Sequence, residues 1–152
     1  RRALDYHAPS GNSGRFHHCA LYAAMNFALL VTAPPLHEQG WHALHFCEAA
    51  IAQGHQVARV FFYGDGVLHG SLLNTPPQDE ARLAERWAAL ANGGTELVIC
   101  VAAALKRGIL DADNARRFDK PVANLAPGFI ISGLGQLAES LVTADRVVSF
   151  VP

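Results

Sequence analysis

The most reactive side chains in this sequence are its three cysteines, Cys19, Cys47 and Cys100. They are widely spaced, odd in number and form no CxxC pair, which argues against a disulfide framework and against a cysteine-based zinc site. Free thiols are typical of a reducing compartment, so we expect a cytoplasmic protein. Because a thiolate is the species that attacks sulfur in thiol exchange, each cysteine is a candidate nucleophile.

Cys100 has the surroundings best suited to that role. It lies near the end of an apolar run, ELVICV at 96–101, that predicts a strand, and a short helical turn is predicted at 102–107. Backbone N–H groups and the helix dipole at such a junction stabilise negative charge. Lys106 and Arg107 follow within two turns and add positive potential. The alternative interpretation is a buried strand cysteine that is inert, as most are.

Other polar residues also follow predicted strands, where ligands gather in parallel sheets. Tyr63, Asp65 and Ser132 could line a pocket around Cys100, and each is equally compatible with a structural role. His37 follows the first predicted strand and could assist proton transfer near neutral pH. The sequence therefore predicts one site, at the carboxyl edge of a sheet.

The remaining candidates have weaker support. His42 and His45 are spaced i, i+3 on a predicted helix, but no third metal ligand is fixed nearby, so a polar helix edge is the better interpretation. Cys47 lies on the apolar face of the same helix and is predicted to pack in the core. The glycine turn at 133–136 lacks the full dinucleotide motif and the Walker lysine. We therefore expect neither a metal nor a cofactor.

Strands and helices alternate along most of the chain. Strands are predicted at 27–33, 56–63, 96–101, 129–132 and 146–151, and helices at 40–54, 79–92, 102–107, 111–118 and 134–141. This order predicts a single α/β domain with a mostly parallel five-stranded sheet and helices on both faces. Cys100 is then expected at the carboxyl end of a central strand, directly before a helix.

The beginning of the chain has a different composition. Residues 1–24 mix Gly, Ser, Pro and His without a period, and the only methionine is Met25. We interpret 1–24 as an extension or tag-like segment and 25–152 as the domain. The apolar run at 19–33 is too short to span a bilayer. A signal peptide is rejected because cleavage near Ala33 would remove the first predicted strand.

Charge and composition exclude several classes of function. Of 152 residues, 12 are Lys or Arg and 13 are Asp or Glu, which gives a net charge near −1. A chain without a basic excess is not expected to bind nucleic acid directly or to bind an anionic membrane. The apolar fraction of 51% is that of an ordinary globular domain, long enough to bury a core.

Several segments together resemble the DsrE/TusD family of sulfur-relay proteins. They are FALLVTAPP at the first predicted strand, FFYGDGV after the second, CVAAALKRGI beginning at Cys100, and SGLGQLAESLVTADRVVSF near the end of the chain. Each motif alone is weak, but the combination covers residues 25–152. The likeness is closest to the TusD-like catalytic branch, because Cys100 is present and the segment AAALKRG follows it. The resemblance implies a DsrE-like fold and a persulfide carrier whose sulfur-accepting residue is Cys100.

The function implied by the resemblance is that of a sulfurtransferase subunit. Cys100 would take sulfur from a donor protein's persulfide and pass it to an acceptor thiol, in 2-thiolation of a tRNA wobble uridine, without a cofactor. The resemblance also implies a heterohexamer with two related DsrE-fold subunits. Two alternatives stay open: a non-catalytic assembly or binding subunit, and a carrier in dissimilatory sulfur oxidation. A cysteine hydrolase is disfavoured because no G-x-C-x-G turn surrounds Cys100.

A long segment between the second predicted strand and the next helix bears on assembly. Residues 64–77 carry Val67, Leu68, Leu72 and Leu73 without a helical or strand period. If exposed, these side chains would form an apolar contact surface for an oligomer. The alternative is a short helix folded over the chain's own core.

Overall fold

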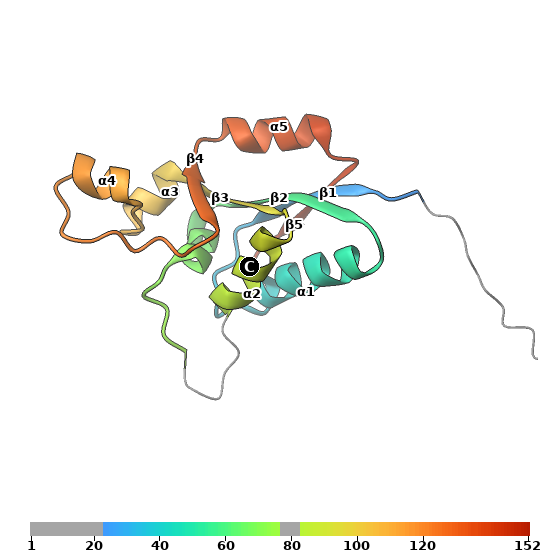
Figure 1. Cartoon of the computed structure of the whole chain (residues 1–152), viewed down its shortest axis with the longest axis horizontal. Helices are drawn as coiled ribbons and strands as arrows, with labels where there is room; N and C mark the ends of the chain where they lie inside the picture. Colours follow the sequence, from blue (N-terminus) through green and yellow to red (C-terminus); the bar gives the residue numbers. More distant parts are fainter. Residues whose placement is uncertain (1–22, 77–82) are drawn as a thin grey trace, which may run out of the picture.

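A five-stranded parallel sheet forms the centre of the molecule (Figure 1). The structure, a computed structural model, describes residues 23–76 and 83–152. The strands are β1 (Asn26–Val31), β2 (Gln56–Phe62), β3 (Glu96–Cys100), β4 (Phe129–Ser132) and β5 (Arg146–Phe150). They lie in the order β4-β3-β2-β1-β5, and each neighbouring pair is parallel. The predicted α/β fold with five strands is confirmed.

Helices cover both faces of this sheet, as predicted. They are α1 (Glu38–Ala52), α2 (Leu83–Asn92), α3 (Val101–Lys106), α4 (Ala112–Arg117) and α5 (Gly135–Thr143). Figure 1 shows α1 and α2 on one face, α5 on the other, and α3 and α4 at the β4 side. Right-handed crossovers explain this, because the chain steps in one direction from β1 to β3 and returns in the opposite direction from β4 to β5.

Two predicted segments extend beyond the described residues. Almost all of the predicted extension at 1–24 lies outside them, and so does the beginning of the helix predicted at 79–92. Among the helices that the structure describes, none is long and apolar enough to cross a membrane.

The interior strands are held by aromatic packing. Phe62 of β2 is fully buried, and its ring centroid lies 5.2 Å from that of Trp87 and 5.4 Å from that of Phe129. These contacts join α2 and β4 to the centre of the sheet. Burial of each large apolar side chain contributes about 2–3 kcal/mol to stability. The carboxyl end of β2 is therefore held against α2 and against the first residue of β4.

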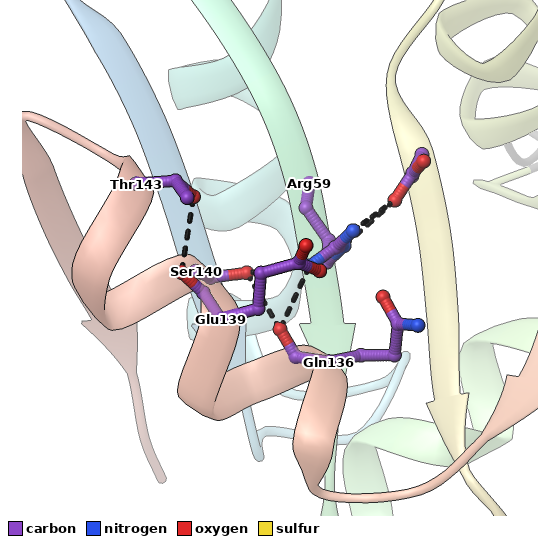
Figure 2. A network of polar contacts seen from close by, with 6 residues as sticks. Arg59, Gln136, Glu139, Ser140 and Thr143 are labelled. Carbon is purple, nitrogen blue, oxygen red and sulfur yellow. Dashed lines mark hydrogen bonds and ion pairs between the residues drawn. The ribbon is translucent and has the colours of Figure 1, made fainter.

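Arg59 of β2 holds α5 on the sheet through polar contacts (Figure 2). Its guanidinium donates to the carboxylates of Glu96 (2.7 Å) and Glu139 (2.9 Å) and to the backbone carbonyl of Gln136 (2.8 Å). The Ser140 hydroxyl donates to the same carbonyl at 2.9 Å. Burial lowers the pKa of Arg59, but the hydrogen bonds and charges of Glu96 and Glu139 outweigh it and hold this pKa above its ordinary value. The sheet-facing side of α5 thus combines these polar contacts with Leu137, which packs against the core.

The segment after β2 first folds inward and then turns outward. Gly64–Gly70 form a 3-10 helix, η1, in which Val67 is fully buried. Leu72 and Leu73 follow it and are exposed. The first half of this segment therefore matches the alternative of a short helix over the core, and only the second half adds apolar surface.

Two glycines allow η1 to approach the sheet closely. A Cβ atom at Gly66 would overlap the Val31 carbonyl, and one at Gly70 would overlap the side chain of Ile99. Because only glycine fits at both positions, the GDGVLHG sequence places η1 directly against the carboxyl ends of β1 and β3.

Candidate functional site

Cys100 is the last residue of β3 and the N-cap of α3. Its backbone is extended, with φ −60° and ψ 120°, and its side chain makes no capping hydrogen bond. The strand ladder ends at the pair formed by Cys100 and Ser132 of β4, and the helix begins at the next residue. This position agrees with the predicted one, at the carboxyl end of an interior strand and directly before a helix.

The thiol of Cys100 is buried, with 2% of the residue exposed. Ser132 lies opposite it on β4, and because adjacent strands are about 4.8 Å apart, the two residues are direct neighbours in the sheet. Ser132 is half-buried, and a Cβ atom at the following Gly133 would meet nothing within 4 Å. The chain directly after β4 is therefore open to solvent next to the pair formed by Cys100 and Ser132.

The predicted positive charges lie at the other end of α3. Lys106 is the last residue of this helix and Arg107 its C-cap, roughly 9 Å along the axis from Cys100. Arg107 donates from Nε to the Asp65 carboxylate at 2.8 Å and from a terminal nitrogen to the Ala103 carbonyl at 3.3 Å. Arg107 and Asp65 thus tie η1 to α3, and a role for these charges at a Cys100 thiolate stays a prediction.

Tyr63 and His37 also lie at the carboxyl edge of the sheet. Tyr63 follows β2, and its N–H donates to the Val31 carbonyl at 2.9 Å. His37 is the N-cap of α1, and its Nδ1 accepts the Gln39 N–H at 3.2 Å. This capping bond is a structural function for His37 that the sequence analysis did not anticipate. His37 follows β1, which is separated from β3 by β2.

His69 of η1 is a polar residue that sequence reasoning missed. It is 1% exposed, and its Nδ1 accepts the indole N–H of Trp87 at 3.1 Å. Because that bond fixes the tautomer, Nε2 carries the proton and donates to the Ala33 carbonyl at 3.2 Å. Burial lowers the pKa of His69 to about 4, although the bond to Ala33 opposes the shift. A neutral His69 therefore anchors η1 over the carboxyl edge. The glycines around His69 were the only sequence signal of this close packing.

The competing histidines and Cys47 occupy structural positions. Cys47 is fully buried in the middle of α1, and burial, followed by the charge of Glu48, raises the pKa of its thiol to about 12. His42 and His45 are exposed on the same helix. Within 23–76 and 83–152, no group of three or more His, Cys, Asp or Glu residues is placed to hold a metal.

Two grooves are found at different places on the surface. One, of about 570 Å³, lies at the amino ends of the strands beside Arg59, Glu96 and Glu139, and no predicted site residue lines it. The other, of about 530 Å³, is lined by Leu73, by Leu105 of α3 and by residues that follow α3, and so lies mainly on the crossover that begins after Cys100.

The sequence pattern of the DsrE/DsrF-like family matches residues 25–150. This chain belongs to the DsrE/DsrF-like family. It is 48% identical over 128 residues to proteins named sulfurtransferase TusD in Salmonella dublin and Salmonella typhi, a span that covers 83% of this chain and all of each relative. These relatives confirm the family resemblance and the predicted sulfurtransferase function.

A solved structure supports the fold of this family member independently. The ychN protein from E. coli superposes with a TM-score of 0.66 at 21% identity, over 84% of this chain and 99% of that one. At that identity the likeness concerns the fold alone.

Proposed function

We propose that this sulfurtransferase carries sulfur as a persulfide on Cys100. The observation behind the proposal is the position of this residue. Of the two cysteines in the described part of the chain, only Cys100 lies where a strand ends and a helix begins, with Ser132 and the open space at Gly133 beside it. In parallel α/β sheets this edge is where reacting groups are placed.

The transfer consists of two sulfur exchanges. In the first, the Cys100 thiolate attacks the outer sulfur of a donor persulfide, the donor's S–S bond breaks, and the donor leaves as a thiolate. In the second, an acceptor thiolate attacks the outer sulfur on Cys100, and Cys100 leaves as a thiolate. Each step makes one S–S bond and breaks one, so no electron carrier is consumed.

The buried state of Cys100 restricts how a partner reaches it. With 2% of the residue exposed, a donor sulfur reaches Cys100 only when a neighbouring segment moves, and the candidates are η1 and the exposed turn at Gly133. Ser132 is placed to contact a sulfur atom added to Cys100, because the two residues are paired across β3 and β4. This restriction favours exchange with a docked protein over exchange with free thiols.

We also propose the wider setting of this activity. The chain acts in the cytoplasm, in a relay with donor and acceptor proteins that leads to 2-thiolation of a tRNA wobble uridine, and it assembles with two related subunits into a heterohexamer. Exposed apolar residues support an assembly: Leu141 and Val142 of α5 and Leu134, its N-cap, are all exposed. Sedimentation of the chain alone and with related subunits tests this. A monomer in both samples would contradict it.

Mass spectrometry after exposure to inorganic polysulfide tests the role of Cys100 directly. We expect a gain of one sulfur atom that a reductant removes, complete loss of this gain in Cys100→Ser, and no loss in Cys47→Ser. All variants carry Cys19→Ser, so that only the two cysteines under comparison remain. If Cys47→Ser loses the added sulfur and Cys100→Ser keeps it, the assignment is wrong.

A further inference from the structure

The groove beside α3 has an apolar floor. It is lined by Leu105, Leu110, Phe118, Val122 and Leu73, among others. Three of these side chains are far from buried, since Leu73 is 71%, Val122 63% and Phe118 43% exposed. Exposed apolar side chains that gather around one concave surface are typical of a contact site.

Hydrogen bonds fix the shape of this groove. The Asn124 side chain is buried; its oxygen accepts the Leu110 N–H and its nitrogen donates to the Gly108 carbonyl, each at 2.9 Å. The Asn124 carbonyl accepts the Leu72 N–H at 2.8 Å, which joins the wall that carries Leu73 to the floor. A preformed surface loses little conformational freedom when a partner binds.

The rim of the groove is positively charged. Lys120 lines it, and Arg117 lies over the ring of Phe118 with 5.4 Å from its guanidinium carbon to the centroid. In the described part of the chain, these two residues form no ion pair, whereas Arg107 pairs with Asp65 and Arg116 with Asp113. Unpaired cations around an apolar floor are complementary to carboxylates that flank apolar side chains.

We propose that this groove binds a segment of the protein that exchanges sulfur with Cys100, and that this segment is rich in leucine and in acidic residues. Helix α3 connects the two features, because it begins after Cys100 and carries Leu105 into the groove. The proposal rests on the proposed function for its purpose, but the docking itself can be measured without sulfur.

A protein segment suits this surface better than RNA does. Single-stranded RNA is bound by aromatic faces on which bases stack along a basic track. Here the floor is mainly aliphatic, with Phe118 as its aromatic side chain, and that ring is already covered by Arg117. Charge at the rim combined with aliphatic packing at the floor is the pattern of a protein interface.

Three synthetic peptides of equal length are suitable probes. Each carries one cysteine among alternating leucine and a second residue, which is glutamate, glutamine or lysine. Binding to the unloaded chain is measured by fluorescence anisotropy, and sulfur transfer from polysulfide-loaded Cys100 by mass spectrometry of the peptide. In the transfer, the peptide thiolate attacks the outer sulfur, and Cys100 leaves as a thiolate.

We expect the glutamate peptide to bind and to accept sulfur roughly tenfold better than the glutamine peptide, with an advantage that falls as salt rises. The double variant Arg117→Glu with Lys120→Glu should remove this preference, and Val122→Asp should weaken binding of the glutamate and glutamine peptides. Arg146→Glu is the matched control, because Arg146 is an exposed cation at the start of β5 and should leave the preference intact.

Equal binding of the three peptides, or an unchanged preference in the double variant, would overturn the docking proposal. A transfer RNA that binds the wild type and is lost in the same variant would also overturn it, in favour of RNA. If Cys100 takes up no sulfur from polysulfide but the glutamate peptide still binds selectively, the proposed function fails and the docking surface stands.

Discussion

Cys47 and Cys100 are both buried, at 0% and 2% exposure, yet the structure gives them different surroundings. Cys47 lies in the middle of α1, on the buried face of a 15-residue helix. Cys100 lies at a junction between two elements, beside a half-buried Ser132 and the open space at Gly133. We therefore expect Cys100 to be the reactive cysteine although both are buried, because their backbone positions differ.

The largest expected effect is a difference between Cys47 and Cys100 in their rates of alkylation in the folded protein. Raising the pKa of Cys47 from 9.0 to about 12 reduces its thiolate at pH 8 by about 1,000-fold, before any effect of access. We therefore expect iodoacetamide to modify Cys100 in the native state and Cys47 only after unfolding, in a Cys19→Ser background. Peptide mass spectrometry over time measures both rates.

The same experiment in urea supplies the control, because both cysteines should then react at similar rates. If Cys47 is modified in the native state as fast as Cys100, the proposed difference in reactivity between the two cysteines is wrong.

Acid should weaken the structure at the Cys100 end through His69. This residue has a pKa of about 4 in the folded protein against 6.5 in the unfolded chain. Between these values the unfolded chain binds a proton that the folded chain does not, so stability falls as pH decreases from 6.5 to 4. The complete shift corresponds to about 3 kcal/mol. Urea denaturation at pH 7 and pH 4.5 measures it.

The variant His69→Gln distinguishes the contribution of His69 to the pH dependence of stability from that of the other histidines. Glutamine keeps a donor for the Ala33 carbonyl but does not titrate, so the variant should lose less unfolding free energy between the two pH values. An equal loss in variant and wild type would assign the pH dependence to other groups and leave η1 without this acid-sensitive anchor.

The fold and the location of the site were predictable because they depend on local patterns. Continuous apolar runs predicted β2 and β3, and the change of pattern after Cys100 predicted the junction with α3. In contrast, the ion pair of Arg107 with Asp65 joins residues 42 positions apart, and each charge alone looked available for the sulfur site. No local pattern encodes such a pairing, because it depends on how η1 and α3 meet in space.

Helix α5 is a second case in which a local pattern did not predict contacts in space. Its leucines predicted a helix, and the helix is present, but only Leu137 packs against the core; Leu134 and Leu141 are exposed, and Ser140 and Glu139 contact Arg59 (Figure 2). A period of apolar residues identifies one face of a helix without saying whether that face meets the core or another molecule. The sequence therefore predicted the element correctly but not which of its leucines would meet the core.

The smallest expected effect concerns the contact that holds η1 beside the Cys100 junction. The pair formed by Asp65 and Arg107 is partly exposed, so its loss in Asp65→Asn should cost about 0.5 kcal/mol. If that pair keeps η1 closed over the end of β3, the same loss raises the open population and should speed alkylation of Cys100 about twofold. Cys47, which is remote from this contact in α1, should be unaffected. Asp113→Asn is the matched control, because it breaks an exposed pair with Arg116 on the neighbouring α4. Equal acceleration in both variants, or none in Asp65→Asn, would show that η1 does not limit access to Cys100 and would leave the opening beside Gly133 as the route for sulfur.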